Sequence, residues 1–437
     1  MKKFSRSALA LALLAASATA QIRLPPLPLQ LPSQPLQGAS QKVEQIDPRS
    51  LERLSAVRHL EINRLVRGNR RVLERDPNGE PIVRSEILAL SPGAAAAARA
   101  RSLNFVVARE QTIDSMNIHL VVYRAPDSMS TQQALRVLRE SDADGIYDYN
   151  HIYIGGGTPP AAHVTVIAQN AQLQASAQQN PRRSTMRVGL LDTGVDTSHP
   201  AFRESTVHTW GCENKLLPEA HGTAVASLLV GRTQGFRGVQ PNAELYAADV
   251  FCGRPTGGAV DALAAALAWM SQEQVPVINI SLVGAKNLML EGIISRVIAA
   301  GFVIVAAVGN DGPAAPPLYP ASYPNVIGVT AVDAHNHVLI EAARGPQVMF
   351  ASPGADLAAA STVHSYAAVR GTSFAAPIVA GLLAASITIP STADAGAAIE
   401  ALAHSAIHPG STGRDFTYGY GLVGTEYRID PMSLIHR

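Results

Sequence analysis

The sequence predicts an α/β protein whose main domain has a mostly parallel sheet covered by helices. From residue 187 onward, short runs of continuous apolar residues alternate with helical segments. Strands that are apolar on both faces are typical of parallel sheets buried between two helical layers. In such a sheet, functional residues gather at the carboxyl ends of the strands. The expected strands cover residues 188–192, 245–250, 277–280, 303–308 and 326–332.

Before residue 156 the pattern is that of a small α+β domain. Apolar runs that suit strands alternate with two helical segments, in the order strand, helix, strand, strand, helix, strand. This is the split ferredoxin-like order, which many unrelated small domains share. The expected strands cover residues 82–90, 104–108, 117–123 and 145–154, and the helices begin at Pro92, after a capping Ser91, and cover residues 131–139.

The first twenty residues have the pattern of a secretory signal peptide. Lys2, Lys3 and Arg6 precede an apolar run over residues 8–16, and Ala18-Thr19-Ala20 fits a small-x-small cleavage site. The apolar run is too short for a permanent membrane span, although an uncleaved anchor is the alternative. We therefore expect export to the periplasm or the medium.

The rest of the chain divides by composition into four parts. Residues 21–69 start with a proline-rich linker and end with a helix predicted over residues 48–67, where apolar residues recur near helical spacing. Residues 70–155 hold the small α+β domain. Residues 156–186 are rich in glycine and then in alanine and glutamine, which indicates a connector. Residues 187–430 hold the parallel-sheet domain.

Composition excludes some classes of function. Hydrophobic residues make up 47% of the 437 residues and charged residues 16%, which suits a chain with a well-filled core. The net charge is +1, so no overall field attracts nucleic acid or an anionic membrane. We expect no nucleic-acid partner.

The chain has two cysteines, Cys212 and Cys252. An even pair in an exported protein usually forms a disulfide, because the compartment is oxidising. The bridge would close a loop across His221. The alternative is a pair of free, buried thiols.

Three widely spaced segments supply a carboxylate, an imidazole and a hydroxyl. Asp192 ends an apolar strand, His221 opens a helical run, and Ser373 starts a helix of small apolar residues. A serine hydroxyl attacks a carbonyl well only when an imidazole accepts its proton and a carboxylate orients that imidazole. Each residue alone also has a structural explanation, as a turn aspartate, one of thirteen histidines and a helix-capping serine.

The order Asp, His, Ser along the chain is the order of subtilisin. The segments around the three residues, at 190–194, 220–223 and 371–377, resemble the motifs of the subtilisin-like serine proteases, or subtilases. Ala224 stands where many members of that family carry a second histidine. Asn310, at the end of an apolar strand, resembles the family asparagine whose amide stabilises the oxyanion of acyl transfer.

The resemblance implies a subtilisin-like three-layer fold and a substrate cleft. Ser281, Leu282, Val283 and Gly284 match the segment that pairs with the substrate backbone in the family. Leu318 falls where members often have a small residue at the bottom of the specificity pocket. A leucine there would shorten the pocket. We expect a preference for small or medium apolar side chains before the cleaved bond.

The resemblance also implies that residues 70–155 are a ferredoxin-like prosegment, which assists folding and blocks the cleft until it is cut. The cut would lie between about Tyr153 and Arg187, in the exposed connector. An independent binding domain that stays attached is the alternative. Residues 231–238 lack the asparagine-rich loop that holds the tight calcium of bacterial subtilisins. We therefore expect no such calcium site, no metal and no cofactor.

These observations predict an exported, self-processing serine endopeptidase, a monomer that acts on protein and peptide substrates. The alternative is a protease-like domain that cuts only itself, or is inactive, and acts as a binding or assembly module. An esterase of the α/β-hydrolase type is excluded because it needs Ser before Asp before His and a Gly-x-Ser-x-Gly elbow. Residues 371–375 lack the second glycine of that elbow.

Overall fold

The computed structural model describes residues 48–113, 117–155, 157–158, 186–362, 364–409 and 413–434. The signal peptide, the proline-rich linker and most of the connector predicted from the sequence lie outside these residues.

The larger part of the molecule is built on a seven-stranded sheet in the order β17-β16-β15-β13-β7-β11-β8. Every pair of neighbouring strands in it is parallel, which confirms the predicted sheet type. The sequence did not indicate the two edge strands, β8 and β17. The strands are β7 (Arg187–Asp192), β8 (Val207–Trp210), β11 (Glu244–Asp249), β13 (Val277–Ile280), β15 (Val303–Ala307), β16 (Ile327–Val332) and β17 (Val348–Pro353).

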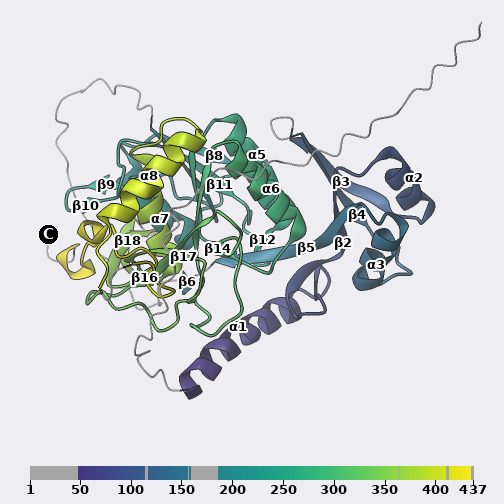
Figure 1. Cartoon of the computed structure of the whole chain (residues 1–437), viewed down its shortest axis with the longest axis horizontal. Coiled ribbons are helices and arrows are strands. Elements are labelled where there is room, and N and C mark those ends of the chain that lie inside the picture. The colour runs from purple at the N-terminus through teal and green to yellow at the C-terminus, as the bar shows by residue number, and fades with distance from the viewer. Residues whose placement is uncertain are drawn as a thin grey trace, which may run out of the picture.

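Helices cover both faces of this sheet, so the domain has three layers (Figure 1). Successive strand residues point to opposite faces. Leu190 accordingly packs in one core with residues of α4, α7 and α8, while Leu191 packs in another with residues of α5 and α6. The helices are α4 (Ala220–Val230), α5 (Val260–Gln272), α6 (Leu288–Ala299), α7 (Thr372–Ala384) and α8 (Thr392–Ser405).

Shorter strands complete this part of the molecule. A hairpin follows α4, two short strands lie beside the helices, and a further hairpin leads into α7. These strands are β9 (Arg232–Thr233), β10 (Phe236–Arg237), β12 (Gly258–Ala259), β14 (Leu282–Val283), β18 (Leu357–Ser361) and β19 (Ser365–Gly371).

The small domain has the predicted order of elements and an antiparallel sheet in the order β5-β2-β4-β3. One face of its sheet packs against α2 and α3. The other face joins the core formed by α5 and α6 of the larger domain. The elements are β1 (Leu73–Arg75), β2 (Pro81–Leu90), α2 (Ala94–Ser102), β3 (Val106–Ile113), β4 (Ile118–Arg124), α3 (Thr131–Ser141) and β5 (Ile146–Gly155).

The predicted start of the first helix in this domain is wrong by two residues. Helix α2 begins at Ala94, with Gly93 rather than Ser91 as its N-cap. Ser91 is instead bound to β4, because its backbone N–H donates to the carbonyl of His119 and its hydroxyl accepts from the His119 N–H.

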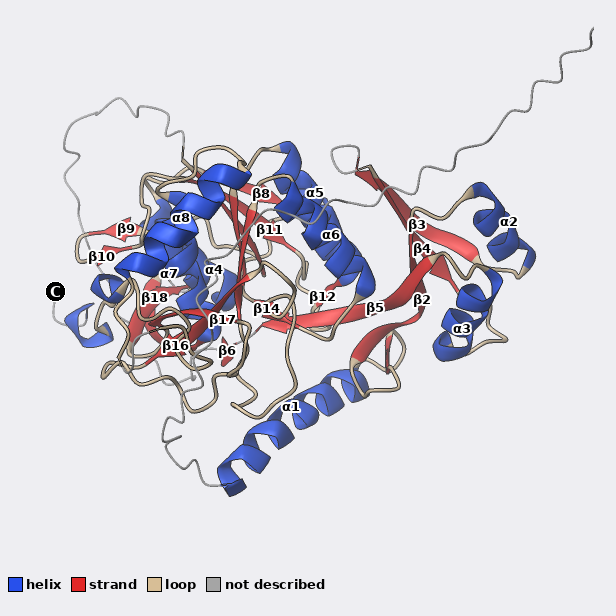
Figure 2. Cartoon of the chain, viewed as in Figure 1, coloured by secondary structure: helices blue, strands red, loops and turns tan. Residues whose placement is uncertain are grey.

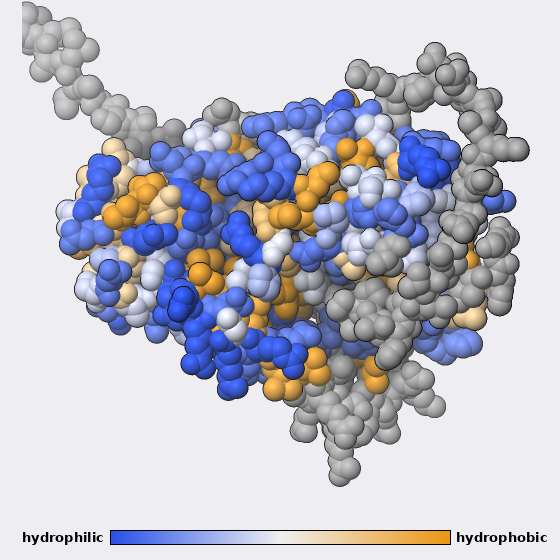
Figure 3. Space-filling model, turned by 180° about the vertical axis from the view of Figure 1, so that it is seen from behind, coloured by the Kyte–Doolittle hydropathy of each residue, from blue (hydrophilic) through white to orange (hydrophobic). Residues whose placement is uncertain are grey.

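The predicted N-terminal helix is present as α1 (Pro48–Gly68), which lies along the side of the molecule near β2 and β5 (Figure 1). No helix within the described residues is long and apolar enough to cross a membrane. Seen from behind, apolar residues reach the surface in separate patches between hydrophilic ones (Figure 3).

Candidate active site

Asp192 and His221 are in direct contact. Asp192 is the last residue of β7 and is fully buried, and His221 lies in the first turn of α4. The Nδ1 atom of His221 is 2.6 Å from Oδ1 of Asp192, which also accepts the backbone N–H of Thr193 at 2.7 Å. The carboxylate is therefore fixed by the backbone and in turn fixes the imidazole.

A glycine allows α4 to approach β7 closely enough for this contact. The Thr193 hydroxyl accepts the backbone N–H of Gly222 at 2.8 Å. A Cβ atom at position 222 would lie only 2.2 Å from the carbonyl oxygen of Thr193. Any larger residue after His221 would push the helix, and the imidazole with it, away from Asp192.

The surroundings of His221 raise its affinity for a proton. Burial alone would lower its pKa, but the charge of Asp192 and the hydrogen bond to it raise the pKa above the usual value. Asp192 thus stabilises the imidazolium that forms when His221 accepts a proton.

Ser373 lies at the amino end of α7 and is fully buried. Its hydroxyl donates to the carbonyl of Ser281 at 3.2 Å. Within the described part of the chain, Nε2 of His221 is buried without a hydrogen-bond partner. The ring of Phe374, the next residue, lies 5.4 Å from the imidazole ring, centre to centre. The structure thus brings Ser373 beside His221 but does not join the two by a hydrogen bond.

Asn310 follows β15 and lies beside the start of α7. Its Oδ1 accepts the backbone N–H of Thr372 at 3.0 Å, which determines which end of the amide is left to donate. Among the described residues its Nδ2 is buried without a partner. A buried donor without a partner is uncommon in folded proteins. It suits a group that binds an oxyanion only during reaction.

The segment Ser281–Gly284 runs beside Ser373. The Ser281 hydroxyl donates to the Ser373 carbonyl at 2.9 Å, and Leu282 and Val283 form β14. Gly284 exchanges two backbone hydrogen bonds with Tyr319. Leu318, the residue before Tyr319, is buried against Gly309, where a Cβ atom would lie 2.5 Å from its Cδ1.

A second short strand in this region is β12, which the sequence did not indicate. The only signal for it was the pair Gly257-Gly258, which is too short to identify a strand. The chain's own β5 reaches both β14 and β12 (Figure 2). It pairs antiparallel with β14, Gly155 opposite Leu282, and with β12, Tyr153 opposite Gly258.

Cys212 and Cys252 form a disulfide, as predicted. Together with Asp249 they are the one group among the described residues whose spacing could hold a metal ion, and the disulfide occupies both sulfur atoms. Burial raises the pKa of Asp249, although its carboxylate accepts the backbone N–H groups of Phe251 and Cys252.

Comparisons with known proteins agree with this geometry. The family model described as the subtilase family matches residues 183–421. Subtilisin DY of Bacillus licheniformis is 30% identical over 256 residues, which is 57% of this chain and 92% of that protein. An alkaline protease of Alkalihalobacillus alcalophilus is 32% identical over 277 residues, covering 61% of this chain and 71% of the relative.

A solved structure has a similar fold. Fervidolysin from Fervidobacterium pennivorans, described as a keratinolytic enzyme related to subtilisin, superposes with a TM-score of 0.64 at 19% identity. The match covers 83% of this chain and 62% of fervidolysin, so this chain spans less than two thirds of that protein's length. The family model matches more than half of the chain, and Asp192, His221 and Ser373 all lie within the matched residues. The chain therefore belongs to the subtilase family of serine endopeptidases.

Proposed function

We propose that this protein is an exported serine endopeptidase, made as a self-processing proenzyme, with Asp192, His221 and Ser373 as its catalytic triad. The observation that carries the proposal is the buried 2.6 Å contact between Asp192 and His221 beside Ser373 at a helix amino end. Ser373 attacks the carbonyl carbon of the substrate while Nε2 of His221 accepts its proton, and His221 then protonates the leaving amine.

Asn310 supplies one of the donors that stabilise the tetrahedral intermediate. Its amide oxygen is held by Thr372, so Nδ2 is the end available for the negatively charged oxygen. The second donor is the backbone N–H of Ser373, at the amino end of α7, where the helix dipole favours negative charge.

The specificity proposal concerns the residue before the cleaved bond. The side chain of Leu318 lies against Gly309, next to Asn310, and so occupies space near the reacting carbonyl. A pocket shortened in this way accepts small or medium apolar side chains better than aromatic or basic ones.

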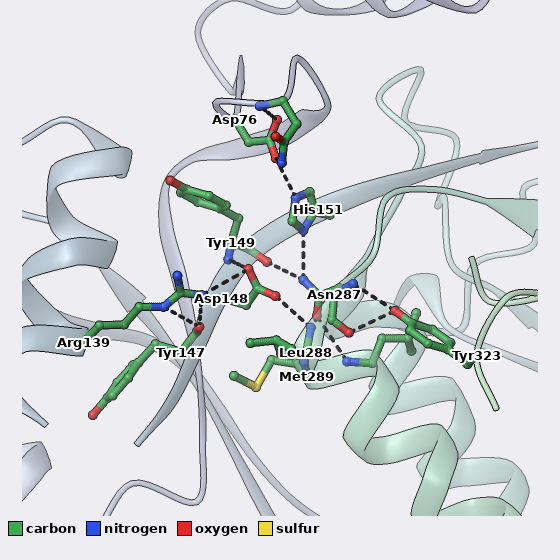
Figure 4. Close-up of polar contacts among 12 residues, drawn as sticks. Asp76, Arg139, Tyr147, Asp148, Tyr149, His151, Asn287, Leu288, Met289 and Tyr323 are labelled. Atoms are coloured by element: carbon green, nitrogen blue, oxygen red, sulfur yellow. Dashed lines mark hydrogen bonds and ion pairs between the residues drawn. The ribbon is translucent and has the colours of Figure 1, made fainter. Parts of the chain in front are cut away.

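Residues 70–155 act as the prosegment. Their last strand, β5, occupies the position of a substrate strand between β12 and β14, and strand addition of this kind is a common mode of peptide binding. Polar contacts strengthen the attachment (Figure 4). The Asp148 carboxylate accepts the Leu288 N–H at 2.7 Å, and Asn287 donates to the Tyr149 carbonyl at 2.8 Å and contacts His151 at 2.9 Å.

Export follows from the predicted signal peptide and is consistent with the disulfide between Cys212 and Cys252. The cell would release a precursor in which the small domain covers the cleft, and processing would then produce the active enzyme.

A serine-directed phosphonate tests the proposal. The secreted wild-type enzyme should react with it at Ser373 and should hydrolyse casein, while Ser373→Ala should accumulate as the full-length precursor. Ser405→Ala, at an exposed serine at the end of α8, is the matched control and should behave as wild type. Labelling of Ser373 without casein hydrolysis would favour the self-cutting module, and processing of Ser373→Ala would contradict self-processing.

A further inference from the structure

A cavity lies at the carboxyl ends of three neighbouring strands of the main sheet, β7, β11 and β8. It is lined by Gly194 in the turn after β7, by Trp210 at the end of β8, by Asp249 at the end of β11 and by Leu217 in the loop before α4. The three residues of the proposed triad do not line it. Ligands of open α/β sheets bind outside this end of the strands, so the cavity is a candidate for a second binding site.

Asp249 provides an unused carboxylate oxygen at this cavity. The residue is 9% exposed. Its Oδ1 accepts the backbone N–H of Phe251 at 2.9 Å and that of Cys252 at 2.8 Å. Its Oδ2 is buried and has no hydrogen-bond partner among the described residues. A buried carboxylate oxygen without a partner is costly and rare, which indicates a ligand that is positively charged or donates a hydrogen bond.

A second oxygen lies close to the first. A Cβ atom built on Gly194 would lie 3.0 Å from Oδ2 of Asp249 and 2.0 Å from the carbonyl oxygen of Leu217. Two oxygens this close to one point can contact the same small ion. Because residue 194 is a glycine, no side chain separates them.

The protein supplies no cation of its own to Oδ2 of Asp249 within its described part. Lys215 lines the cavity, but its ammonium lies 3.0 Å from a carboxylate oxygen of Glu213 and its side chain is 68% exposed. Burial raises the pKa of Asp249 and the charge of Asp192 raises it further, against the backbone hydrogen bonds and the charge of Arg254. A cation bound at Oδ2 would stabilise the charged form of this carboxylate.

The available oxygens determine which kind of cation fits. Ca²⁺ takes about six to eight oxygen ligands and often a bidentate carboxylate, whereas Oδ1 of Asp249 is already used by two N–H groups. Zn²⁺ would use thiolates, but the sulfur atoms of Cys212 and Cys252 are joined in the disulfide. One carboxylate oxygen and one carbonyl oxygen carry a single negative charge, which suits a monovalent cation that keeps part of its water shell.

We propose that this protein binds one alkali-metal ion, Na⁺ or K⁺, between Oδ2 of Asp249 and the carbonyl oxygen of Leu217. The inference goes beyond the proposed function and does not rest on it. The ion connects the end of β11 with the loop that leads into α4, and His221 lies in the first turn of that helix. Binding therefore stabilises the fold at the place where the imidazole is held against Asp192.

Thermal unfolding tests the cation. Full-length Ser373→Ala protein is melted in NaCl, in KCl and in choline chloride, whose cation is too large for the site, at equal ionic strength. An ion at about ten times its dissociation constant should raise Tm by about 2–4 °C relative to choline. Asp249→Asn, added to Ser373→Ala, keeps the shape of the side chain and should remove this difference. Equal Tm values in the three salts, or the same difference in Asp249→Asn, would overturn the inference.

Two further variants serve as controls for this experiment. Glu204→Gln removes a carboxylate whose side chain is 69% exposed and should leave the difference between the salts unchanged. Lys215→Met should also leave it unchanged. A larger difference in Lys215→Met would mean that the lysine ammonium occupies the site in solution, which contradicts the proposal, and loss of the difference in Glu204→Gln would identify a general effect of surface charge.

Crystals test the position without altering residue 249. Crystals of the Ser373→Ala protein are soaked in thallium(I) acetate, because Tl⁺ is a monovalent cation with strong anomalous scattering. We expect an anomalous peak in contact with Oδ2 of Asp249 and with the Leu217 carbonyl, and its height should fall when NaCl or KCl competes. Absence of a peak at these two oxygens, or a peak that neither salt reduces, would refute the assigned site.

Discussion

Replacing Asp148 by asparagine should shorten the time for which the prosegment inhibits the enzyme. Asp148 is 7% exposed, and its Oδ2 accepts the backbone N–H of Leu288 at 2.7 Å, at the first residue of α6. The variant Asp148→Asn keeps an oxygen acceptor of the same shape and removes the negative charge. It therefore removes the attraction between the carboxylate and the positive end of the α6 dipole. It also removes the charge that lies 3.9 Å from Arg139 and one of two acceptors, since Oδ1 accepts the Tyr149 N–H at 2.8 Å.

The size of the effect follows from this geometry. A charge near a helix amino end contributes about 0.3–1 kcal/mol when exposed and up to about 2 kcal/mol when partly buried. Asp148 is buried, so we expect a loss near the upper end, about 1–2 kcal/mol. That corresponds to an about five- to thirtyfold increase in the dissociation constant of the cut prosegment. Most of the increase should appear in the dissociation rate, as is usual for a single change at an interface.

The assay is the lag before activity appears. Purified precursor is allowed to process itself, processing is followed by mass, and peptide hydrolysis is recorded until the rate is constant. Asp148→Asn should process at the wild-type rate and then show an about five- to thirtyfold shorter lag. Asp144→Asn, at an exposed carboxylate in the turn before β5, is the matched control and should leave the lag unchanged. An unchanged lag for Asp148→Asn, or the same change in the control, would refute the argument.

Four further predictions concern the site and its surroundings. Asn310→Ala should lower kcat by about 10²- to 10³-fold, the size found for one oxyanion donor in a subtilisin, and a steady-state assay that shows a change in KM alone would contradict it. Leu318→Gly should raise kcat/KM for a peptide with phenylalanine before the cleaved bond by about tenfold relative to one with alanine. Since Asp192 raises the pKa of His221 against the effect of burial, kcat/KM should rise with pH through a midpoint above the usual histidine value. Asp192→Asn should lower that midpoint and reduce kcat by about 10⁴-fold. Burial alone would raise the pKa of Asp76, but hydrogen bonds to its carboxylate make the net pKa lower than usual. Asp76 therefore stabilises the fold above its usual pKa, and this stabilisation is lost as the pH falls through the lowered pKa. Melting curves of the inactive precursor at several acidic pH values should show this loss for wild type and not for Asp76→Asn.

The five interior strands of the main sheet could be predicted from their apolar runs, but the edge strand β17 could not, although all six of its residues are buried. β7 is apolar between its two end residues and β13 is apolar except for Asn279, and the prediction located both to within one residue. β8 could not be found in this way, because Val207–Trp210 is a half-buried edge strand that includes a histidine and a threonine. This strand therefore carries little of the apolar signal on which the prediction depends.

The positions of the site residues followed from motifs, but their contacts did not. The order of Asp192, His221 and Ser373 is visible in the sequence, whereas the hydrogen bond from Ser373 to Ser281 depends on where β13 ends in space. The same is true of β12, because its two small residues form a strand only by pairing with β5. Contacts between segments far apart in the chain depend on tertiary packing that no local pattern records.

Helix α1 makes a second contact with the larger domain, in addition to the pairing of β5. Arg58 is buried between two carboxylates, with Nη2 2.7 Å from Glu80 and Nε 3.4 Å from Asp311, the residue after Asn310. Burial raises the pKa of Asp311, and the charge of Arg58 opposes that rise. The charge of Asp311 is therefore balanced by a residue that lies before the processing region. In the maturation that we propose, Asp311 would be solvated by water once the amino-terminal part departs. Release of that part would then also change the charge environment beside Asn310, the proposed oxyanion donor.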